Sequence, residues 1–321
     1  MIKLVITGNH LTPAEALIEQ LPRDLKVYKL GDLNGPKFKR YDWWHSVWGL
    51  FKLPGLILKA KAKLRKISAA VVVSFGGYSA VPVVWAAKIL KIPILIHEQT
   101  FAAGLASKIT GRLADVIAIS WESSRQNFPK LKTVLTGNPL RGEILRVKRR
   151  PQPVIYITGG HQGSRVINKT VEQILPQLLQ QFTVYHQHGK LPRPAVCEHY
   201  VTKAYFSAGE LAKIYSQASL VIGRAGINTV MELAYLKIPA VLIPLPYTQR
   251  LEQDINARYL EKLGLAVILP QDRLTPASLL TAIGKASSLP QTSPGSGFPY
   301  VRVREAAKKL CRLVVKLSRE T

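Results

Sequence analysis

Residues 5–17 of the chain read VITGNHLTPAEAL. An apolar run over residues 2–6 leads into a tight glycine turn, and a helical pattern begins directly after the turn. A strand, a turn and a helix in this order form the repeating unit of parallel α/β sheets. The same order returns at residues 154–164, VIYITGGHQGS, so the sequence predicts two α/β domains.

Further apolar runs extend this pattern through both halves of the chain. They lie at residues 71–74, 92–96, 116–119 and 133–135, and again at 220–222, 240–243 and 266–269. Helical patterns separate the runs, as in doubly wound sheets whose strands are covered on both faces. We expect one domain over residues 1–148, a second over 149–300, and a last helix over 301–321 that returns toward the first domain.

The composition restricts the compartment and the kind of partner. Cys197 and Cys311 are the only cysteines, which favours a reducing compartment and argues against a disulfide framework or a zinc cage. The formal net charge of +26 favours an anionic partner. Nucleic acid, a phosphorylated substrate and acidic lipid all fit this charge, and composition alone does not choose among them.

One segment combines aromatic and basic residues in an unusual way. Residues 41–69 read YDWWHSVWGLFKLPGLILKAKAKLRKISA. This pattern fits a helix that lies in a membrane interface, and it also fits a core helix with a basic outer face. No run of about 18 apolar residues is present, so a spanning helix is not expected. The residues that would contact an anionic membrane are Trp43, Trp44, Trp48, Lys52, Lys59, Lys61, Lys63, Arg65 and Lys66.

Four glycine turns follow predicted strands, at the sheet edge where open α/β sheets bind ligands. They are TGNH (7–10), SFGGYSAVP (74–82), TGGHQGS (158–164) and GRAGINTVMELA (223–234). None continues as the glycine-lysine-serine/threonine run of a P-loop, and TGGHQGS lacks the acidic partner of a nicotinamide fingerprint. The turns therefore indicate a nucleotide diphosphate site without an obvious metal cage, which suits a sugar nucleotide.

Five blocks together resemble glycosyltransferase family 28: SFGGYSAVP, HEQTFAAGLASK, TGNPLR, GGHQGSRVIN and RAGINTVMELA. The resemblance implies the GT-B fold, in which two doubly wound, Rossmann-like domains face one cleft. It also implies a UDP-GlcNAc donor, no cofactor and no required metal. The first domain would bind the acceptor and the membrane, and the second would bind the UDP-sugar.

The resemblance further implies a role in peptidoglycan synthesis. The expected reaction is inverting transfer of N-acetylglucosamine to the 4-hydroxyl of a lipid-linked muramyl-pentapeptide, which converts lipid I to lipid II. It would take place at the cytoplasmic face of the bacterial cell membrane, on a peripheral protein. The alternatives are another family 28 glycolipid transferase, a sugar-nucleotide epimerase of the same fold, and a degenerate membrane scaffold that binds nucleotide. No nucleic-acid recognition motif is found, so a nucleic-acid partner is not expected.

In the first domain, the family's threonine-glycine-glycine-histidine loop corresponds to Thr7, Gly8, Asn9 and His10. The resemblance makes His10 the candidate general base, a task that suits an imidazole near neutral pKa. The alternative is that His10 only caps the helix or orients the diphosphate. Thr100 replaces the usual family asparagine, and Asn9 replaces a glycine. Arg141 matches a family arginine near the substrate and is the last candidate residue of the first domain.

In the second domain, the family's serine becomes His161, which is followed by Gln162 and Gly163. The resemblance assigns Glu232 to the ribose hydroxyls and Gln253 to the sugar hydroxyls. The whole donor-binding helix start is predicted to contact the substrate: Ile227, Asn228, Thr229, Val230, Met231 and Glu232.

Overall fold

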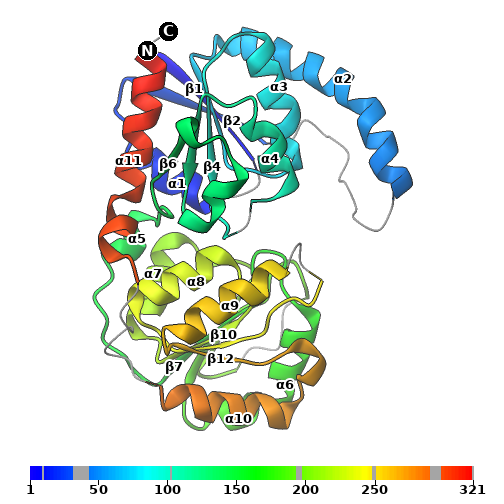
Figure 1. Cartoon of the computed structure of the whole chain (residues 1–321). Helices are drawn as coiled ribbons and strands as arrows, with labels where there is room; N and C mark the ends of the chain where they lie inside the picture. The colour runs from blue at the N-terminus through cyan, green and yellow to red at the C-terminus, as the bar shows by residue number, and fades with distance from the viewer. Residues whose placement is uncertain are drawn as a thin grey trace. The chain divides into compact units, whose positions relative to one another are not determined.

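The computed structural model describes residues 1–8, 11–31, 43–101, 103–192, 197–247, 251–289 and 298–319, without the side chains of residues 11, 43–51, 300 and 301. The chain forms two compact units. The first unit comprises Met1–Arg141 and Val301–Thr321, and the second comprises Gly142–Tyr300. Each unit contains one six-stranded parallel sheet (Figure 1), so the predicted pair of doubly wound α/β domains is confirmed.

The sheet of the first unit has the strand order β2-β1-β3-β4-β5-β6. Its strands are β1 (Ile2–Thr7), β2 (Leu25–Leu30), β3 (Val71–Ser74), β4 (Ile94–Glu98), β5 (Val116–Ile119) and β6 (Thr133–Leu135). Its helices are α1 (Leu11–Ile18), α2 (Trp43–Ile67), α3 (Val81–Ile89), α4 (Leu105–Gly111) and α11 (Tyr300–Arg319), with 3-10 turns η1 (Tyr78–Ala80), η2 (Glu122–Asn127) and η3 (Lys130–Lys132).

Alternate residues of the central strands β1, β3, β4 and β5 enter two different cores. Val5 of β1 packs with α2 and α3 in one core, whereas Leu4 packs with α1 and α11 in the other. Since successive side chains of a strand point to opposite faces, a strand covered on both faces must be apolar throughout. The second of these cores joins distant parts of the chain, because Leu310 and Val314 of α11 lie in it with Leu4.

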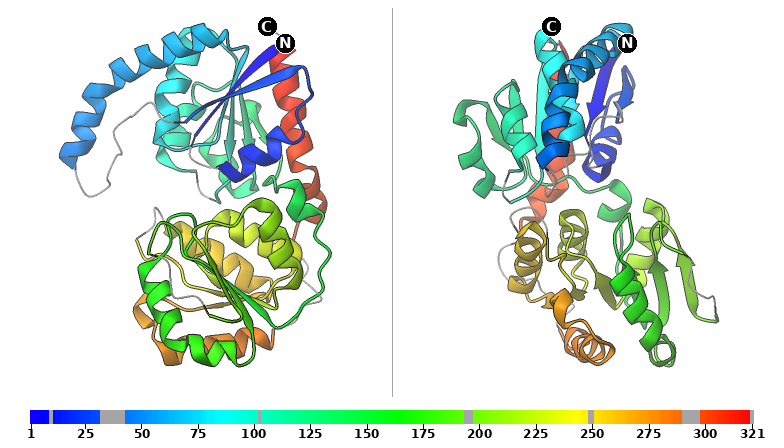
Figure 2. Two further views of the ribbon diagram at one scale, coloured as in Figure 1. Left: turned by 180° about the vertical axis from the view of Figure 1, so that it is seen from behind. Right: turned by 90° about the vertical axis from the view of Figure 1, so that its right-hand side faces the viewer.

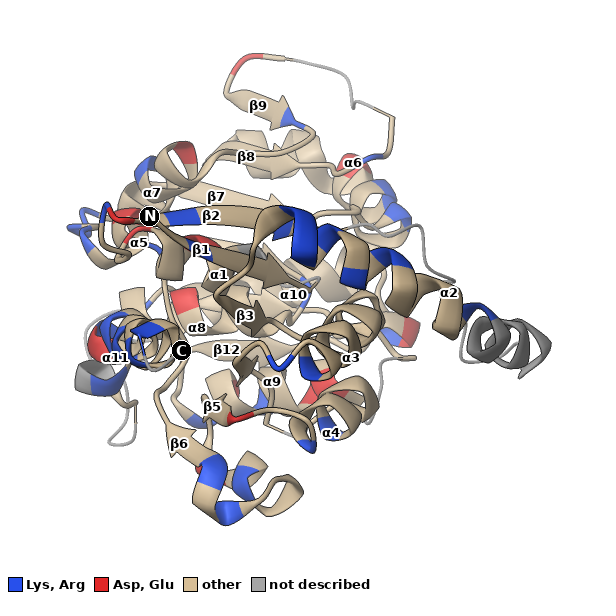
Figure 3. Cartoon of the chain, turned by 90° about the horizontal axis from the view of Figure 1, so that it is seen from above, with Lys and Arg blue, Asp and Glu red and all other residues tan. Residues whose placement is uncertain are grey.

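The helix α2 contains the aromatic and basic segment singled out above. Its described part packs into the first core through Leu56, Ala60 and Leu64, one turn apart. Lys52, Lys59, Lys63, Arg65 and Lys66 are exposed and Lys61 is partly exposed, which gives the helix a basic outer face (Figure 3). The side chains of Trp43, Trp44 and Trp48 lie outside the described residues, so contact with a membrane stays a prediction. Among the described helices, none has an apolar stretch that could cross a bilayer.

The sheet of the second unit has the strand order β12-β11-β10-β7-β8-β9. Its strands are β7 (Val154–Thr158), β8 (Thr183–Gln187), β9 (Tyr200–Lys203), β10 (Leu220–Gly223), β11 (Ala240–Leu242) and β12 (Ala266–Ile268). Its helices are α5 (Gly142–Leu145), α6 (Arg165–Leu179), α7 (Ala208–Gln217), α8 (Ile227–Leu236), α9 (Glu252–Lys262) and α10 (Pro276–Ser287), with the 3-10 turn η5 (Gln271–Arg273).

Helices cover both faces of this second sheet. On one face, α6 and α10 pack on Ile155, Ile157 and Val184. On the other face lie α7, α8 and α9 (Figure 2), and the ring of Tyr215 on α7 meets the ring of Tyr156 on β7 edge-on. The glycine turns that follow β7 and β10 are thereby placed at the carboxyl edge of a sheet that helices cover on both faces.

Candidate functional site

The chain order of the second sheet reverses between β7 and β10, since β8 and β9 extend to one side and β11 and β12 to the other. Open parallel sheets bind ligands at the carboxyl ends of the strands beside such a reversal. A cavity of about 510 Å³ lies at this point. It is lined by Thr158, Gly159, Gly160, His161, Gln162, Gly163, Ser164, Arg165, Val166, Arg224, Gly226, Thr229, Leu245, Gln253 and Gln271.

The glycine turn after β7 forms one wall of the cavity, as the sequence predicted. A Cβ atom at Gly159 would lie 2.3 Å from the backbone nitrogen of Ser164. Gly163 has φ +80°, and a Cβ atom there would lie 2.2 Å from the carbonyl oxygen of His188. Side chains are excluded at both positions, so the loop presents backbone rather than side chains to a ligand. His161 and Gln162 in the same loop are exposed.

Two helices begin at the cavity. Ser164 caps α6, and its Oγ accepts a hydrogen bond from the backbone nitrogen of Ile167 at 3.4 Å. The helix α8 begins after Gly226, which has no side chain that could cap it. The positive ends of two helix dipoles and the uncapped amides of α8 therefore face the same space. Such an arrangement stabilises an anion, for example a diphosphate.

Arg224 supplies a fixed positive charge to the cavity, and sequence reasoning did not single it out. Its Nη1 donates to the carbonyl oxygen of Ile243 at 3.0 Å, and its Nη2 donates to Ser164 Oγ at 2.8 Å and to Gln271 Oε1 at 2.5 Å. Burial lowers the pKa of this guanidinium from its usual value, but it stays charged at neutral pH. The signal that could have found it is its place, directly after the strand beside the chain reversal.

The predicted donor-binding stretch of α8 divides between the cavity and the core. Thr229 lines the cavity. The side chains of Ile227, Val230 and Met231 are buried in the unit, so only their backbone could reach a ligand. Asn228 is partly exposed.

Two further predicted side chains are already engaged in hydrogen bonds. Glu232 is 3% exposed, and its Oε2 accepts a hydrogen bond from the Tyr215 hydroxyl at 3.2 Å. Gln253 on α9 lines the cavity, and its Oε1 accepts a hydrogen bond from the backbone nitrogen of Leu245 at 2.9 Å. The amide nitrogen of Gln253 is the part of this side chain suited to bind a sugar hydroxyl.

In the first unit, the corresponding chain reversal lies between β1 and β3. The backbone nitrogen of Phe75 donates to the carbonyl oxygen of Thr7 at 2.8 Å. Gly8 has φ +121°, and a Cβ atom there would lie 2.7 Å from the carbonyl oxygen of Gly76. The first two glycine turns of the sequence are therefore in contact. Asn9 and His10 lie outside the described residues, so the structure does not test the base assignment.

Thr100 belongs to a tight turn after β4. Its hydroxyl donates to Glu98 Oε1 at 2.6 Å, and its carbonyl oxygen accepts from Ser124 Oγ at 2.6 Å. The side chain is 7% exposed. A threonine at this position therefore stabilises the loop, and its hydroxyl proton is already donated within the protein.

Arg141 and Asn138 lie in the segment after β6 and are both buried, at 5% and 1% exposure. Arg141 Nη1 lies 3.8 Å from Glu15 Oε2 on α1. The Asn138 side chain has no hydrogen-bond partner at either polar atom among the described residues. Buried amides without partners are rare in folded proteins and often mark a ligand site. Asn138 was not among the predicted residues, although it lies in the quoted TGNPLR block.

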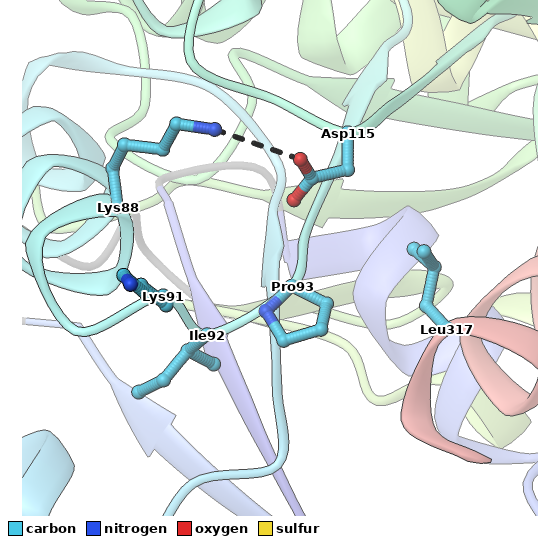
Figure 4. A pocket seen from close by; sticks show the side chains of 6 residues that line it. All are labelled: Lys88, Lys91, Ile92, Pro93, Asp115 and Leu317. Atoms are coloured by element: carbon cyan, nitrogen blue, oxygen red, sulfur yellow. Dashed lines mark ion pairs between the residues drawn. The ribbon is translucent and has the colours of Figure 1, made fainter. Parts of the chain in front are cut away.

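A hollow of about 330 Å³ lies at the amino edge of the first sheet, opposite the carboxyl edge that carries the glycine turns (Figure 4). Lys88, Lys91, Ile92, Pro93, Asp115 and Leu317 line it. Lys88 Nζ is 3.7 Å from Asp115 Oδ1, and Asp115 Oδ2 accepts from the backbone nitrogen of Ile94 at 2.9 Å. This hollow adjoins the amino ends of β4 and β5, away from the chain reversal, and we assign no ligand to it. Within the described ranges, no three His, Cys, Asp or Glu side chains gather as metal ligands would.

Comparison with known proteins identifies the family. The glycosyltransferase family 28 N-terminal domain matches residues 18–119, and the family 28 C-terminal domain matches residues 154–296. A UDP-N-acetylglucosamine–N-acetylmuramyl-(pentapeptide) pyrophosphoryl-undecaprenol N-acetylglucosamine transferase 2 of Bacillus cereus is 32% identical over 87% of this chain and 90% of its own. The transferase of this name from Listeria welshimeri is 31% identical over 96% of both chains.

Solved structures show the same fold. The crystal structure of Acinetobacter baumannii MurG covers 98% of this chain with a TM-score of 0.68 and 24% identity. A UDP-GlcNAc 2-epimerase of Methanocaldococcus jannaschii reaches a TM-score of 0.64 at 10% identity, which shows a shared architecture alone. Since both family domains match and relatives exceed 30% identity over nearly the whole chain, the chain belongs to glycosyltransferase family 28, with the GT-B fold of a MurG-like glycosyltransferase.

Proposed function

We propose that the protein transfers N-acetylglucosamine from UDP-GlcNAc to the 4-hydroxyl of a lipid-linked muramyl-pentapeptide, converting lipid I to lipid II. The observation that carries the proposal is the cavity at the reversal between β7 and β10. Its size and its ring of backbone amides suit a sugar nucleotide. The printed names of the curated relatives state the donor sugar and the lipid-linked acceptor of those proteins.

The donor diphosphate would lie against the amino ends of α6 and α8, beside Arg224. As the bond from the anomeric carbon to UDP breaks, negative charge grows on the leaving phosphate. Helix amides and a guanidinium held by Ser164 and Gln271 stabilise that charge without reorganising. Thr229 and Gln253 line the same cavity and would contact the sugar.

The first unit would supply the acceptor and the base. In this proposal His10 takes the proton of the acceptor 4-hydroxyl while the hydroxyl oxygen attacks the anomeric carbon from the side opposite UDP. One glycosidic bond forms, the bond to UDP breaks, and the anomeric configuration inverts. Gly8, two residues before His10 in the sequence, contacts the glycine turn at Gly76. Arg141 would contribute a positive charge near the substrate, in competition with its ion pair to Glu15.

A lipid-linked acceptor requires contact with a membrane, and α3 and α4 offer a surface for it. Trp85 and Ile89 lie one turn apart on α3, and Leu105 and Ile109 lie one turn apart on α4. All four are more than a third exposed, on helices that contact each other. Lys108 and Arg112 flank this apolar surface. Apolar side chains bordered by cations bind anionic bilayers, so we add this surface to the predicted contacts on α2.

The test is transfer of labelled GlcNAc from UDP-GlcNAc to a lipid I analogue by the wild type and by His10→Ala. We expect transfer by the wild type and a loss of at least about 100-fold in the variant, the usual contribution of a general base. Transfer that survives the substitution would remove His10 as the base and keep the function. Binding of UDP without transfer to any lipid acceptor would favour the alternative of a membrane scaffold that binds nucleotide. Transfer to a different lipid acceptor would favour the alternative of another family 28 glycolipid transferase.

A further inference from the structure

The end of β8 carries a buried histidine that the transfer reaction does not use. His186 is 0% exposed. It lies two residues after Val184, which packs in the core beneath α6, so His186 points to the same face of the sheet. A polar ring at such a position must be satisfied by hydrogen bonds within the protein.

Three hydrogen bonds define the role of this ring. The Asn168 amide nitrogen on α6 donates to the carbonyl oxygen of His188 at 3.3 Å. The Asn168 amide oxygen therefore faces His186 Nε2 at 3.1 Å and accepts a hydrogen bond from its N–H. The other ring nitrogen, Nδ1, lies 2.7 Å from the Tyr200 hydroxyl and accepts from it. A continuous chain of donors and acceptors thus runs from β9 through β8 to α6.

The surroundings keep this chain neutral. Burial, and secondarily the nearby His188, lower the pKa of His186 to about 4. Burial is also the main cause that raises the pKa of the Tyr200 hydroxyl. Both groups are therefore uncharged at neutral pH, and each hydrogen bond keeps the direction given above.

The far end of the chain adjoins the nucleotide cavity. The carbonyl oxygen of His188, which accepts from Asn168, is also the atom that lies 2.2 Å from a Cβ atom built on Gly163. Gly189 also lies against the glycine loop, since a Cβ atom built on it would lie 2.2 Å from the backbone nitrogen of Gly163. In addition, the Asn168 backbone nitrogen donates to the carbonyl oxygen of Ser164 at 2.9 Å. Asn168 thereby joins the start of α6 to the segment that supports the glycine loop.

We propose that Tyr200, His186 and Asn168 form a positioning relay that holds the glycine loop 159–163 and the start of α6 in the geometry that binds a nucleoside diphosphate. None of the three lines the cavity, so they are positioning residues rather than catalytic ones. The identity of the ligand rests on the proposed function, whereas the support of the loop does not.

The first measurement is hydrogen exchange of the loop amides in the full-length protein without nucleotide. Tyr200→Phe removes one hydroxyl, His186→Leu removes the whole ring, and His186→Gln keeps a side chain that can donate to Asn168. One lost hydrogen bond should speed exchange of residues 159–167 by roughly threefold to tenfold. Exchange should be fastest in His186→Leu, slower in His186→Gln and slowest in the wild type. Tyr235→Phe is the matched control, since it removes a part-buried hydroxyl that donates to the carbonyl oxygen of Leu145 at 3.3 Å, outside the relay.

The second measurement is the Kd for UDP by titration calorimetry. Tyr200→Phe should raise the Kd by roughly threefold to tenfold and Tyr235→Phe should leave it unchanged, although each removes one tyrosine hydroxyl that is hydrogen-bonded within the protein. A merely structural role would lower the stability of both variants alike without this difference in affinity.

The outcomes separate the two proposals. Loop exchange and UDP affinity in Tyr200→Phe equal to those of Tyr235→Phe would overturn the relay. Faster loop exchange in a protein whose wild type does not bind UDP would overturn the proposed function and uphold the relay. If His186→Leu fails to fold, as circular dichroism would show, Tyr200→Phe decides the question because it removes a single oxygen atom.

Discussion

Gly160 and Gly163 offer a matched test of how the glycine loop is built. Both lie in the wall of the cavity and have nearly equal backbone angles, φ +81° and +80°. They differ in surroundings, because a Cβ atom at Gly160 meets nothing within 4 Å, whereas one at Gly163 lies 2.2 Å from the carbonyl oxygen of His188. Alanine at either position therefore strains the backbone equally, and only Gly163→Ala also forces the loop away from His188, the residue after β8.

The size of the two effects follows from these distances. The left-handed backbone costs alanine about 1–2 kcal/mol at both positions. The Cβ atom at Gly163 and the carbonyl oxygen of His188 must move about 1 Å further apart, because their distance would be 2.2 Å and ordinary contacts begin at 3.4 Å. Such overpacking adds about 1–3 kcal/mol. With about 2–4 °C in Tm for each kcal/mol, we expect a loss of roughly 2–8 °C for Gly160→Ala and roughly 4–20 °C for Gly163→Ala, always larger than that of its partner variant.

The assay is thermal unfolding followed by circular dichroism, with and without saturating UDP. UDP should raise the Tm of Gly160→Ala, as it does for any protein that binds it when folded. For Gly163→Ala the rise should nearly vanish, because displacing a preorganised binding loop by about 1 Å can cost on the order of 100-fold. Equal Tm losses in the two variants, or equal protection by UDP, would refute the reasoning.

Three further predictions concern the phosphate site, the membrane surface and the dependence on pH. Arg224→Lys should raise the Kd for UDP at least about tenfold, because lysine cannot reproduce the paired guanidinium geometry; calorimetry that shows an unchanged Kd would remove this cation from the phosphate site. Ile89→Glu should reduce flotation with vesicles of anionic lipid, while Val201→Glu, at an exposed site of the second unit, should float like wild type. Because the pKa of His186 falls from 6.5 to about 4 on folding, the unfolded chain gains a proton first as pH drops. Urea unfolding should therefore show a loss of about 3 kcal/mol between pH 6.5 and 4, and the slope should be flatter in His186→Gln.

Strands with helices on both faces give the clearest signal in the sequence, although the edge strands β6 and β12 were also predicted. Strands covered on both faces read as continuous apolar runs, and the central strands β1, β3, β5, β7 and β10 carry this signal. The edge strands β2 and β9 were missed, because polar residues interrupt their apolar runs: Lys26 and Lys29 in β2, and Thr202 and Lys203 in β9. The strand β8 was missed for another reason, since His186 and Gln187 are polar but buried and their partners come from other elements.

The candidate site shows the same limit. Its glycine turns are visible in the sequence because the backbone itself requires them, at positive φ and in close contact. Arg224 was not found, because its role depends on Ser164 and Gln271, which lie 60 and 47 residues away along the chain.

The local sequence pattern of an amphipathic helix does not distinguish packing against the protein core from lying in a membrane interface. In α2, the row Leu56, Ala60 and Leu64 faces the protein core, and only the packing partners reveal this.

The core that joins Leu4 and Leu17 to Leu310 and Val314 has a consequence for the order of folding during synthesis. The ribosome releases all of Gly142–Tyr300 before it releases α11. The second unit can therefore complete its core while the part of the first sheet that α11 covers is still exposed to water. A fragment ending at Arg141 would lack α11, leave the apolar residues beneath that helix exposed and should aggregate. The fragment Gly142–Tyr300 contains every strand of its own sheet and is the better choice for separate expression.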